Sequence, residues 1–304
     1  MKILHVNNQA SVGYLLSRSQ RKLGHKSDLL ALNMKGQREP DYAEKSVRTL
    51  FLRLLKLLPS YELIHVHGGI GISGLGLAPF KASGKRFFAH YHGSELREGI
   101  QTSFHRIAER IFVSTPDLLR YCDNVGGREL IHIPNPVHMG DSERIDFHRR
   151  LKEIEKRGHI LASHLPSLRE VKGTDNVIRG VEEARKLGAS IELDIIENLP
   201  PDEAMERLER SDICIDWMSP DYDIHGVVSV EAMARGIPAI CNIKRSLYPG
   251  DIPIMDCRPE ELGGLLHDIY LNPGRLIEIS RRSREYAVAH HHPDNVARLI
   301  ERFI

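Results

Sequence analysis

The stretch "DICIDWMSPDYDIHGVVSVEAMARGIPAICN", residues 212–242, decides the fold because it contains a complete strand–helix–strand unit. The apolar run at 212–217 predicts a strand, and the pattern at 227–235 predicts a helix that stops before Gly236. A second apolar run at 237–242 predicts another strand. Two strands joined through a helix favour neighbouring places in a parallel sheet.

The same alternation of short apolar runs and longer helical patterns extends over the rest of the chain. The apolar runs predict strands at 2–6, 27–32, 62–67, 86–91, 110–114, 129–134, 159–164, 190–196, 212–217, 237–242 and 252–256. Helical patterns occur at 12–23, 43–58, 174–187, 201–210, 227–235, 259–271, 273–289 and 293–304. The sequence therefore predicts an α/β protein in which helices cover parallel sheets.

The alternation is interrupted at "PNPVHMGDSERIDFHRR", residues 134–150, where two prolines bracket Asn135 and polar residues follow. This composition is typical of a hinge. We expect a Rossmann-like domain at 1–135, a hinge at 136–158 and a second Rossmann-like domain at 159–290. Neither domain carries the dinucleotide motif G-x-G-x-x-G after its first strand, which disfavours a nicotinamide dehydrogenase. No P-loop motif occurs, which disfavours a P-loop enzyme. Ligands bind beyond the carboxyl ends of parallel strands, so a cleft between two facing sheets is the expected site.

Composition argues against several classes of function and location. The 304 residues have a hydrophobic fraction of 41% and a net charge of +1, from 42 basic and 41 acidic side chains, so nucleic acid is not an expected partner. The four cysteines lie far apart and predict no metal site. The start, "MKILHVNN", reads as a first strand rather than a signal peptide. No run reaches the ~18 apolar residues of a membrane span, so we expect a cytoplasmic protein.

An anion site is predicted where the helix at 227–235 begins. Gly226 permits a ligand to approach the backbone closely. The amides of Val227, Val228 and Ser229 are donors at the positive end of the helix dipole and suit a diphosphate.

Two carboxylates flank this anion site. Glu231 lies one turn into the helix and could accept hydrogen bonds from ribose hydroxyls, whereas Asp223, in the preceding loop, could accept them from a sugar. The alternative is that the helix dipole simply favours Glu231 and that Asp223 is an ordinary loop residue. The spacing alone does not decide between the two.

The segment "DIHGVVSVEAMARGIPAI", residues 223–240, resembles the E-x7-E signature of retaining GT-B glycosyltransferases of family 4. In this sequence Asp223 stands where the family usually has its first glutamate. The resemblance extends to "ELIHVHGG" (62–69), "FFAHYHGSEL" (87–96) and "SLREVKGTDNVIRG" (167–180). It also includes "SVGYLLSRSQRKLGHKSDLLAL" (11–32), where Gly13 alone remains of the family's usual Gly-Gly.

The resemblance implies roles for further residues. Arg169 and Lys172 would stabilise the departing diphosphate, since fixed cations lower the barrier to its release; the alternative is a solvated basic turn. His92 would donate to the donor sugar through its ring or its backbone. Gly13 would lie at the sugar or phosphate. The predicted strand end at Asn198 and Leu199 could meet the base.

Several other residues are expected to have no direct function. We interpret His67, His90 and His164 as structural histidines. The run "HHH" at 290–292 makes a poor metal site because adjacent helical side chains point in different directions. The D-x-D pattern "DYD" at 221–223 resembles a cation motif of another glycosyltransferase fold, but the cations and amides named above can neutralise a diphosphate without metal. We therefore predict neither a metal nor a cofactor.

The resemblance implies a metal-independent transferase that moves a sugar from a UDP- or GDP-linked donor to an unidentified acceptor with retention of configuration. The second domain would hold the donor, the first domain would meet the acceptor, and the last helix, within 291–304, would cross back to the first domain. The alternatives are a nucleotide-sugar epimerase and a binding protein without transfer. Basic residues among the leucines of 50–58 allow peripheral membrane contact, although such a helix more often covers a sheet. The sequence leaves the oligomeric state open.

Overall fold

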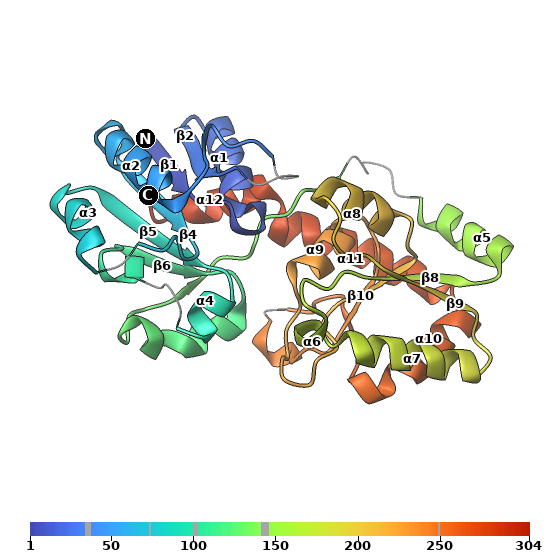
Figure 1. Ribbon diagram of the computed structural model, residues 1–304. Helices are drawn as coiled ribbons and strands as arrows, with labels where there is room; N and C mark the ends of the chain where they lie inside the picture. The colour runs from blue at the N-terminus through green and yellow to red at the C-terminus, as the bar shows by residue number, and fades with distance from the viewer. Residues whose placement is uncertain (34–37, 73, 100–102, 141–145, 249) are drawn as a thin grey trace. The chain divides into compact units, whose positions relative to one another are not determined.

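The computed structural model describes residues 1–33, 38–72, 74–99, 103–140, 146–248 and 250–304. The chain forms two compact units: unit 1 contains residues 1–137 and 291–304, and unit 2 contains residues 138–290. Each unit is built on its own parallel sheet (Figure 1). The predicted α/β class with two parallel sheets is therefore confirmed.

Unit 1 has a seven-stranded sheet in the order β3-β2-β1-β4-β5-β6-β7. The strands are β1 (Lys2–Val6), β2 (Lys26–Leu32), β3 (Tyr42–Glu44), β4 (Leu63–His67), β5 (Arg86–Tyr91), β6 (Arg110–Val113) and β7 (Ile131–His132). Strand β3 lies where the sequence predicted the start of a helix. The helix begins only at Val47, because Ser46 caps it and exchanges hydrogen bonds with Thr49.

Helices cover both faces of this sheet. They are α1 (Val12–Lys22), α2 (Val47–Leu57), α3 (Ala78–Ala82), α4 (Ser94–Arg97) and α12 (Pro293–Glu301), with short 3-10 helices η1 (Gln9–Ser11), η2 (Leu58–Ser60), η3 (Gly74–Leu77), η4 (Ser103–Arg106) and η5 (Pro116–Val125). One face packs against α2 and α3 through Leu54 and Phe80. The other packs against α1 and α12 through Leu16, Val296 and Ile300. The C-terminal segment thus completes the core of unit 1.

Unit 2 has a five-stranded sheet in the order β12-β11-β10-β8-β9. The strands are β8 (Ile160–His164), β9 (Ile191–Ile195), β10 (Ile213–Ile215), β11 (Ala239–Cys241) and β12 (Met255–Asp256). The helices are α5 (Phe147–Arg157), α6 (Arg169–Lys172), α7 (Thr174–Lys186), α8 (Pro201–Glu209), α9 (Val227–Ala234), α10 (Leu262–Leu271) and α11 (Arg275–His291), with η6 (Arg245–Leu247) and η7 (Pro259–Glu261). Helices α7 and α10 lie side by side (Figure 1), and Gly180 allows their close approach because a Cβ there would lie 2.7 Å from Leu262.

Helix α5 occupies much of the stretch that was expected to be a hinge, residues 136–158. The carboxylate of Asp146 accepts a hydrogen bond from the Arg149 amide at 2.9 Å and so caps the helix, and Gly158 ends it in the left-handed conformation with φ 74°. Ile154 packs into the core of unit 2. The boundary between the units therefore falls between residues 137 and 138, and α5 is part of unit 2.

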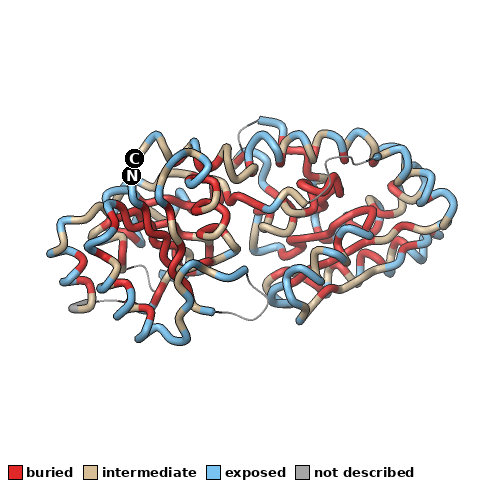
Figure 2. Tube along the Cα trace, turned by 90° about the horizontal axis from the view of Figure 1, so that it is seen from above, coloured by how far each residue is buried: buried red, intermediate tan, exposed pale blue. Residues whose placement is uncertain are grey.

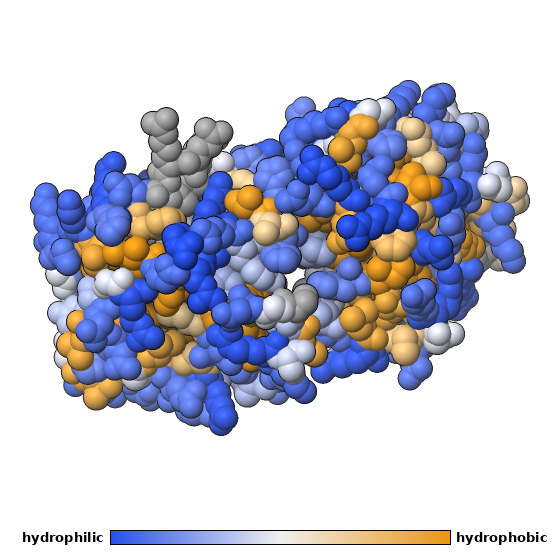
Figure 3. Space-filling model, turned by 180° about the vertical axis from the view of Figure 1, so that it is seen from behind, coloured by the Kyte–Doolittle hydropathy of each residue, from blue (hydrophilic) through white to orange (hydrophobic). Residues whose placement is uncertain are grey.

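Burial follows the layers of each unit. Figure 2 shows buried strands at the centre of each unit and exposed residues on the outer sides of the surrounding helices. On the face seen in Figure 3, hydrophobic residues form small groups among hydrophilic ones. Over the residues that the structure describes, none of the helices combines the length and the hydropathy that a membrane span requires.

Candidate functional site

A buried carboxylate, Asp216, lies at the start of α9. Strand β10 ends at Ile215, so Asp216 directly follows it. The Oδ2 atom of Asp216 accepts hydrogen bonds from the Gly226 amide (2.9 Å), the Ser229 amide (3.3 Å) and the Ser229 hydroxyl (2.6 Å). The prediction that all three amides of 227–229 are open to a diphosphate is therefore wrong for Ser229. Among the described residues, the amides of Val227 and Val228 have no hydrogen-bond acceptor.

Lys172 lies beside the same carboxylate. Its Nζ atom is 2.5 Å from Asp216 Oδ1 and 4.3 Å from the centre of the Trp217 ring. The Met218 amide donates to the Lys172 carbonyl at 3.0 Å, which fixes the end of α6 against the loop after β10. The structure therefore brings Lys172 to the start of α9, as the resemblance implied, but pairs its ammonium with a carboxylate that the sequence analysis did not single out.

The Asp216 carboxyl is ionised in spite of its burial. Burial alone favours the neutral form of Asp216, but Lys172 and the Ser229 hydroxyl outweigh it and hold the pKa of this carboxyl below its usual value. The two opposite charges cancel within the pair. The remaining positive potential at this end of α9 then comes from the helix dipole and from the amides of Val227 and Val228.

Position 226 requires a glycine because its surroundings leave no room for a side chain. A Cβ at this position would lie 2.6 Å from Lys172 Nζ, 2.6 Å from Trp217 Nε1 and 2.7 Å from Asp216 Oδ2. Its φ of −93° is accessible to any residue, so crowding rather than backbone freedom excludes a side chain. The Trp217 indole N–H is buried and has no acceptor among the described residues. This unsatisfied donor next to the helix start is a second indication of an anion site.

Glu231 lies in the second turn of α9 and is partly buried. Its carboxyl has no recorded hydrogen-bond partner among the described residues, and Arg235 bonds to its backbone carbonyl instead, at 3.0 Å. Burial raises the pKa of Glu231 to about 7; Arg235 opposes the shift and Asp216 adds to it. Near neutral pH this carboxyl is therefore present in both protonation states and can both donate to and accept from hydroxyl groups.

Arg169 is engaged elsewhere. Its guanidinium forms an exposed ion pair with Glu197, at 2.6 Å between Nη2 and Oε2. Asn198, next in the chain, takes a left-handed conformation with φ 56°. Leu199 packs at the edge of the apolar cluster that also contains Val228 of α9. Leu199 and Val228 thus pack against the same apolar cluster, whereas the charge of Arg169 is directed to Glu197.

Asp223 is exposed and lines a different hollow in unit 2. This pocket has a volume of about 430 Å³, and its other lining residues are Asn242, Ile243, Lys244, Asp256, Cys257, Arg258 and Glu261. Neither Lys172 nor Glu231 is among them. The structure therefore does not bring Asp223 into one pocket with Glu231, although the sequence spacing suggested that a single ligand joins them.

Gly13 is a packing residue of unit 1. It is buried, and a Cβ there would lie 2.5 Å from the carbonyl oxygen of Asn7. The preceding loop is strained, because Ala10 (φ 50°) and Ser11 (φ 60°) both adopt the left-handed conformation without being glycine. Asn8 closes the loop by accepting the Tyr14 amide at 2.9 Å. Gly13 therefore allows α1 to begin close to the end of β1.

Both donors expected of His92 are turned into the protein. Its backbone amide donates to the carboxylate of Glu95. Its Nδ1 atom lies 3.1 Å from the side-chain oxygen of Asn135, and its Nε2 atom is buried without a partner. Burial lowers the pKa of His92, so the ring is neutral at neutral pH.

Other histidines have structural partners. His164 bonds to the Ile215 carbonyl at 2.8 Å and to the Thr174 hydroxyl at 2.9 Å, which confirms its structural interpretation. In the run 290–292, the ring of His291 lies 2.8 Å from the Asn135 carbonyl, and His292 accepts the Asp294 amide at the start of α12. These rings are directed to separate partners, as expected.

Asp216 is the principal residue of this site that the sequence analysis missed. It lies inside an apolar strand pattern, where an acidic residue has no hydrophobic reason to be. A carboxylate at the end of a buried strand, immediately before a predicted anion loop, is the signal that could have identified it.

Comparison with solved structures identifies proteins with a similar fold. No family model matches the sequence, and no curated protein matches it significantly. Among solved structures, the Anabaena protein HepE, in complex with UDP and glucose, is similar with a TM-score of 0.63 and 12% identity over 100% of this chain and 99% of that one. Sucrose-phosphate synthase from Thermosynechococcus elongatus has a TM-score of 0.69 and 11% identity, covering 100% and 98%. UDP-GlcNAc 2-epimerase from Methanocaldococcus jannaschii has a TM-score of 0.60 and 13% identity, covering 100% and 99%.

These similarities establish the GT-B fold, with two Rossmann-like units, and so confirm the predicted fold class. The structural neighbours are mostly glycosyltransferases, and epimerases occur among them. At such low identity the likeness concerns the fold, and function must be argued from the residues of this chain.

Proposed function

We propose that this chain is a retaining glycosyltransferase of the family 4 type that uses a UDP- or GDP-linked sugar. The observation that carries the proposal is the start of α9, where two amides without acceptors, a buried indole N–H and Lys172 lie together beside Glu231. Donors without acceptors at a helix N-terminus suit the two phosphates of a nucleotide sugar.

The diphosphate accepts hydrogen bonds from the amides of Val227 and Val228. Asp216 holds the first turn of α9 in place through Gly226 and Ser229, and it keeps Lys172 at this turn. As the glycosidic bond breaks, negative charge grows on the diphosphate, and these fixed donors stabilise it without rearranging.

Arg169 is recruited on binding. Its present partner, Glu197, forms an exposed ion pair, and such pairs contribute little because solvent screens them. A charge-assisted bond to a phosphate is stronger than that. Exchange of Glu197 for the diphosphate is therefore favourable.

Glu231 binds the ribose hydroxyls, and Asp223 binds the sugar. Since Asp223 now lines another pocket, the loop that carries it must move when the donor binds. Asn198 and Leu199 contact the base. Departure and attack take place on the same face of the sugar, because both carboxylates are assigned to hydroxyls rather than to the anomeric carbon. Gly13 and His92 take no direct part, since their polar groups are directed into unit 1. Transfer needs no divalent ion at the diphosphate.

The test is a thermal-shift screen of the full chain against nucleotides and nucleotide sugars. A ligand at 100 times its Kd stabilises the native state by about 2.7 kcal/mol, or roughly 5–10 °C for a unit of this size. We expect a shift with UDP or GDP compounds in the wild type, no shift in Glu231→Ala, and a normal shift in Glu182→Ala, which alters an exposed glutamate of α7. An undiminished shift in Glu231→Ala would place the nucleotide elsewhere.

A nucleotide-sugar epimerase is the second candidate, favoured by the full-length similarity to UDP-GlcNAc 2-epimerase. The two activities separate when a UDP-sugar is incubated without acceptor and followed by NMR. An epimerase yields an isomeric UDP-sugar, whereas a transferase leaves the donor unchanged until an acceptor is supplied. A protein that only binds would neither isomerise the donor nor release diphosphate in any acceptor mixture.

A further inference from the structure

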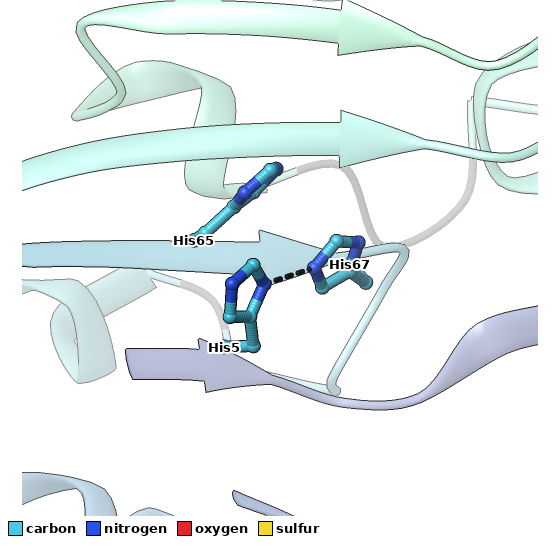
Figure 4. Close-up of side chains that lie close together, drawn as sticks. All are labelled: His5, His65 and His67. Atoms are coloured by element: carbon cyan, nitrogen blue, oxygen red, sulfur yellow. Dashed lines mark hydrogen bonds between the residues drawn. The ribbon is translucent and has the colours of Figure 1, made fainter. Parts of the chain in front are cut away.

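Five histidines of unit 1 lie on neighbouring strands and form what we call the histidine cluster: His5 of β1, His65 and His67 of β4, His90 of β5, and His92 just after β5. The strands pair so that His5 is level with His65, and His67 with His90. Residues two apart on a strand point to the same face. The rings therefore gather on one face of the sheet, and Figure 4 shows three of them together.

The cluster is buried, and most of its ring nitrogens have no partner. His5, His65, His67 and His90 are all fully buried. Both nitrogens of His65 and His90, Nδ1 of His67 and Nε2 of His92 have no hydrogen-bond partner among the described residues. A buried polar group without a partner has lost its bonds to water and gained none in exchange, which destabilises the fold. So many in one place call for a ligand that accepts lone pairs.

Hydrogen bonds determine which nitrogen of His67 carries its lone pair. The Nε2 atom of His5 lies 2.8 Å from the side-chain oxygen of Gln20, which can only accept, so this nitrogen of His5 is the protonated one. The other nitrogen of His5, Nδ1, must then accept from Nε2 of His67, at 2.9 Å. That leaves a lone pair on Nδ1 of His67, which has no partner.

The same reasoning applies at the other end of the cluster. Nδ1 of His92 donates to the side-chain oxygen of Asn135 at 3.1 Å, so the unpartnered Nε2 carries the lone pair. The ring centre of His90 lies 4.5 Å from that of His92 and 5.5 Å from that of His67, and the centres of His67 and His92 are 5.6 Å apart, so the three rings form a triangle. In metal-binding histidines, one ring nitrogen bonds to a protein group and the other carries the lone pair for the ion, which is the division of roles seen in His67 and His92.

We propose that His67, His90 and His92 bind a divalent transition-metal ion, with Zn²⁺ as the expected ion, through Nδ1 of His67, one ring nitrogen of His90 and Nε2 of His92. Imidazole nitrogen favours this class of ion over Mg²⁺ or Ca²⁺, which prefer oxygen. Three protein ligands leave a fourth position for water.

The separation of the rings fits an ion after a small adjustment. One ring nitrogen from each of the three residues lies within 4.8 Å of the others. A point equidistant from three atoms 4.8 Å apart is about 2.8 Å from each, and zinc–nitrogen bonds are about 2.0–2.1 Å. Each nitrogen must therefore move inward by at most about 0.7 Å, and the rings, whose planes lie 24–38° from one another, must also turn so that their lone pairs meet at the ion.

A second set, His5, His65 and His67, also has ligand atoms within 4.8 Å of one another. Nδ1 of His5 and Nε2 of His67 already bond to each other in this set, as the dashed line in Figure 4 shows. An ion between them would break that bond. The His67–His90–His92 set needs no such break, so we assign the ion to it.

This inference does not rest on the proposed transferase activity, because the nucleotide is assigned to unit 2.

The test measures metal content directly. The full chain is stripped with chelator under mild denaturation, refolded, dialysed against Zn²⁺, and analysed by elemental mass spectrometry, with Co²⁺ absorption as a second readout. We expect about one equivalent of metal in the wild type and at least a tenfold loss in His90→Gln. His290→Gln alters the one exposed histidine of the run 290–292 and should bind as the wild type does.

Folding of His90→Gln is checked by far-UV circular dichroism, and His90→Phe offers an apolar replacement beside Phe88 and Phe112 should the glutamine variant fail. The cobalt spectrum of the wild type is independent of any variant and should show the strong visible bands of a four-coordinate site. Less than a tenth of an equivalent in the refolded wild type, or equal binding in a folded His90 variant, would overturn the assignment. So would loss of binding in His290→Gln.

Discussion

The ion pair between Lys172 and Asp216 predicts a large loss of stability when only one partner is removed. Both side chains are buried, with side-chain exposures of 7% and 0%. Lys172→Met leaves the Asp216 carboxylate buried without its counter-ion, and breaking a buried pair in this way costs about 3–5 kcal/mol. Replacing both partners, as Lys172→Met with Asp216→Ala, removes the uncompensated charge. We expect the double variant to recover a substantial part of the loss.

The assay is urea unfolding followed by fluorescence. The chain has a single tryptophan, Trp217, and Lys172 lies 4.3 Å from its ring centre. The signal therefore reports the unfolding of unit 2 at the pair itself. The matched control is Arg169→Met, which breaks the exposed pair with Glu197 and should cost far less stability, because solvent screens that pair. A loss below about 1 kcal/mol in Lys172→Met, or single and double variants whose losses simply add, would refute the buried-pair reasoning.

The pair also predicts an inversion of the pH dependence. In the wild type the pKa of Asp216 is lowered, so its contribution to stability is present above the unfolded pKa and is lost as the pH falls. In Lys172→Met, burial dominates and raises the pKa of Asp216. The fold of this variant then favours the neutral form of Asp216, so the contribution of Asp216 to the free energy of unfolding is greatest at acid pH and is lost as the pH rises. The difference between the wild type and Lys172→Met should therefore grow from pH 4 to pH 8.

Three further outcomes are expected. Gly226→Ala should abolish nucleotide-induced thermal shifts, because its Cβ would lie 2.6 Å from Lys172 Nζ; a normal shift would show that this turn tolerates a side chain. Burial raises the pKa of Glu231 to about 7. Its contribution to the free energy of unfolding is therefore complete below the unfolded pKa of about 4.3 and is lost as the pH rises through 7. Glu231→Gln should remove that fall in urea titrations, and an unchanged pH profile would contradict it. Transfer should persist in EDTA, and complete loss restored by Mn²⁺ would contradict metal-independent transfer, since Mn²⁺ is a weak competitor for imidazole sites.

The elements could be predicted from the sequence wherever their hydrophobic pattern was strong. The strand at 86–91 and the helix at 174–187 lie within one residue of β5 and α7, because buried strands and amphipathic helices carry clear periods. Helix α5 was missed. Its apolar residues, Phe147, Leu151 and Ile154, are few among charged ones, and the preceding prolines favoured a hinge.

The site was less accessible to sequence reasoning. The loop–helix pattern located the start of α9 and placed Lys172 near it. That pattern could not show that the Asp216 carboxylate accepts a hydrogen bond from the Ser229 amide, because this contact depends on how deeply the end of β10 is buried. The histidine cluster illustrates the same limit. The spacing of His65 and His67 puts both on one face of a strand, but only the strand register brings His90 level with His67.

The position of α12 has a consequence for the order of events during synthesis. The chain leaves unit 1 at residue 137, builds all of unit 2, and returns at 291. Until α12 emerges from the ribosome, one side of the first sheet lacks Val296 and Ile300, and the Ser19 hydroxyl lacks its acceptor Asp294. Unit 2 can therefore fold before the core of unit 1 is completed by α12. A fragment ending at 137 would expose that apolar side permanently, so isolating unit 1 requires a circular permutant that joins 291–304 ahead of residue 1.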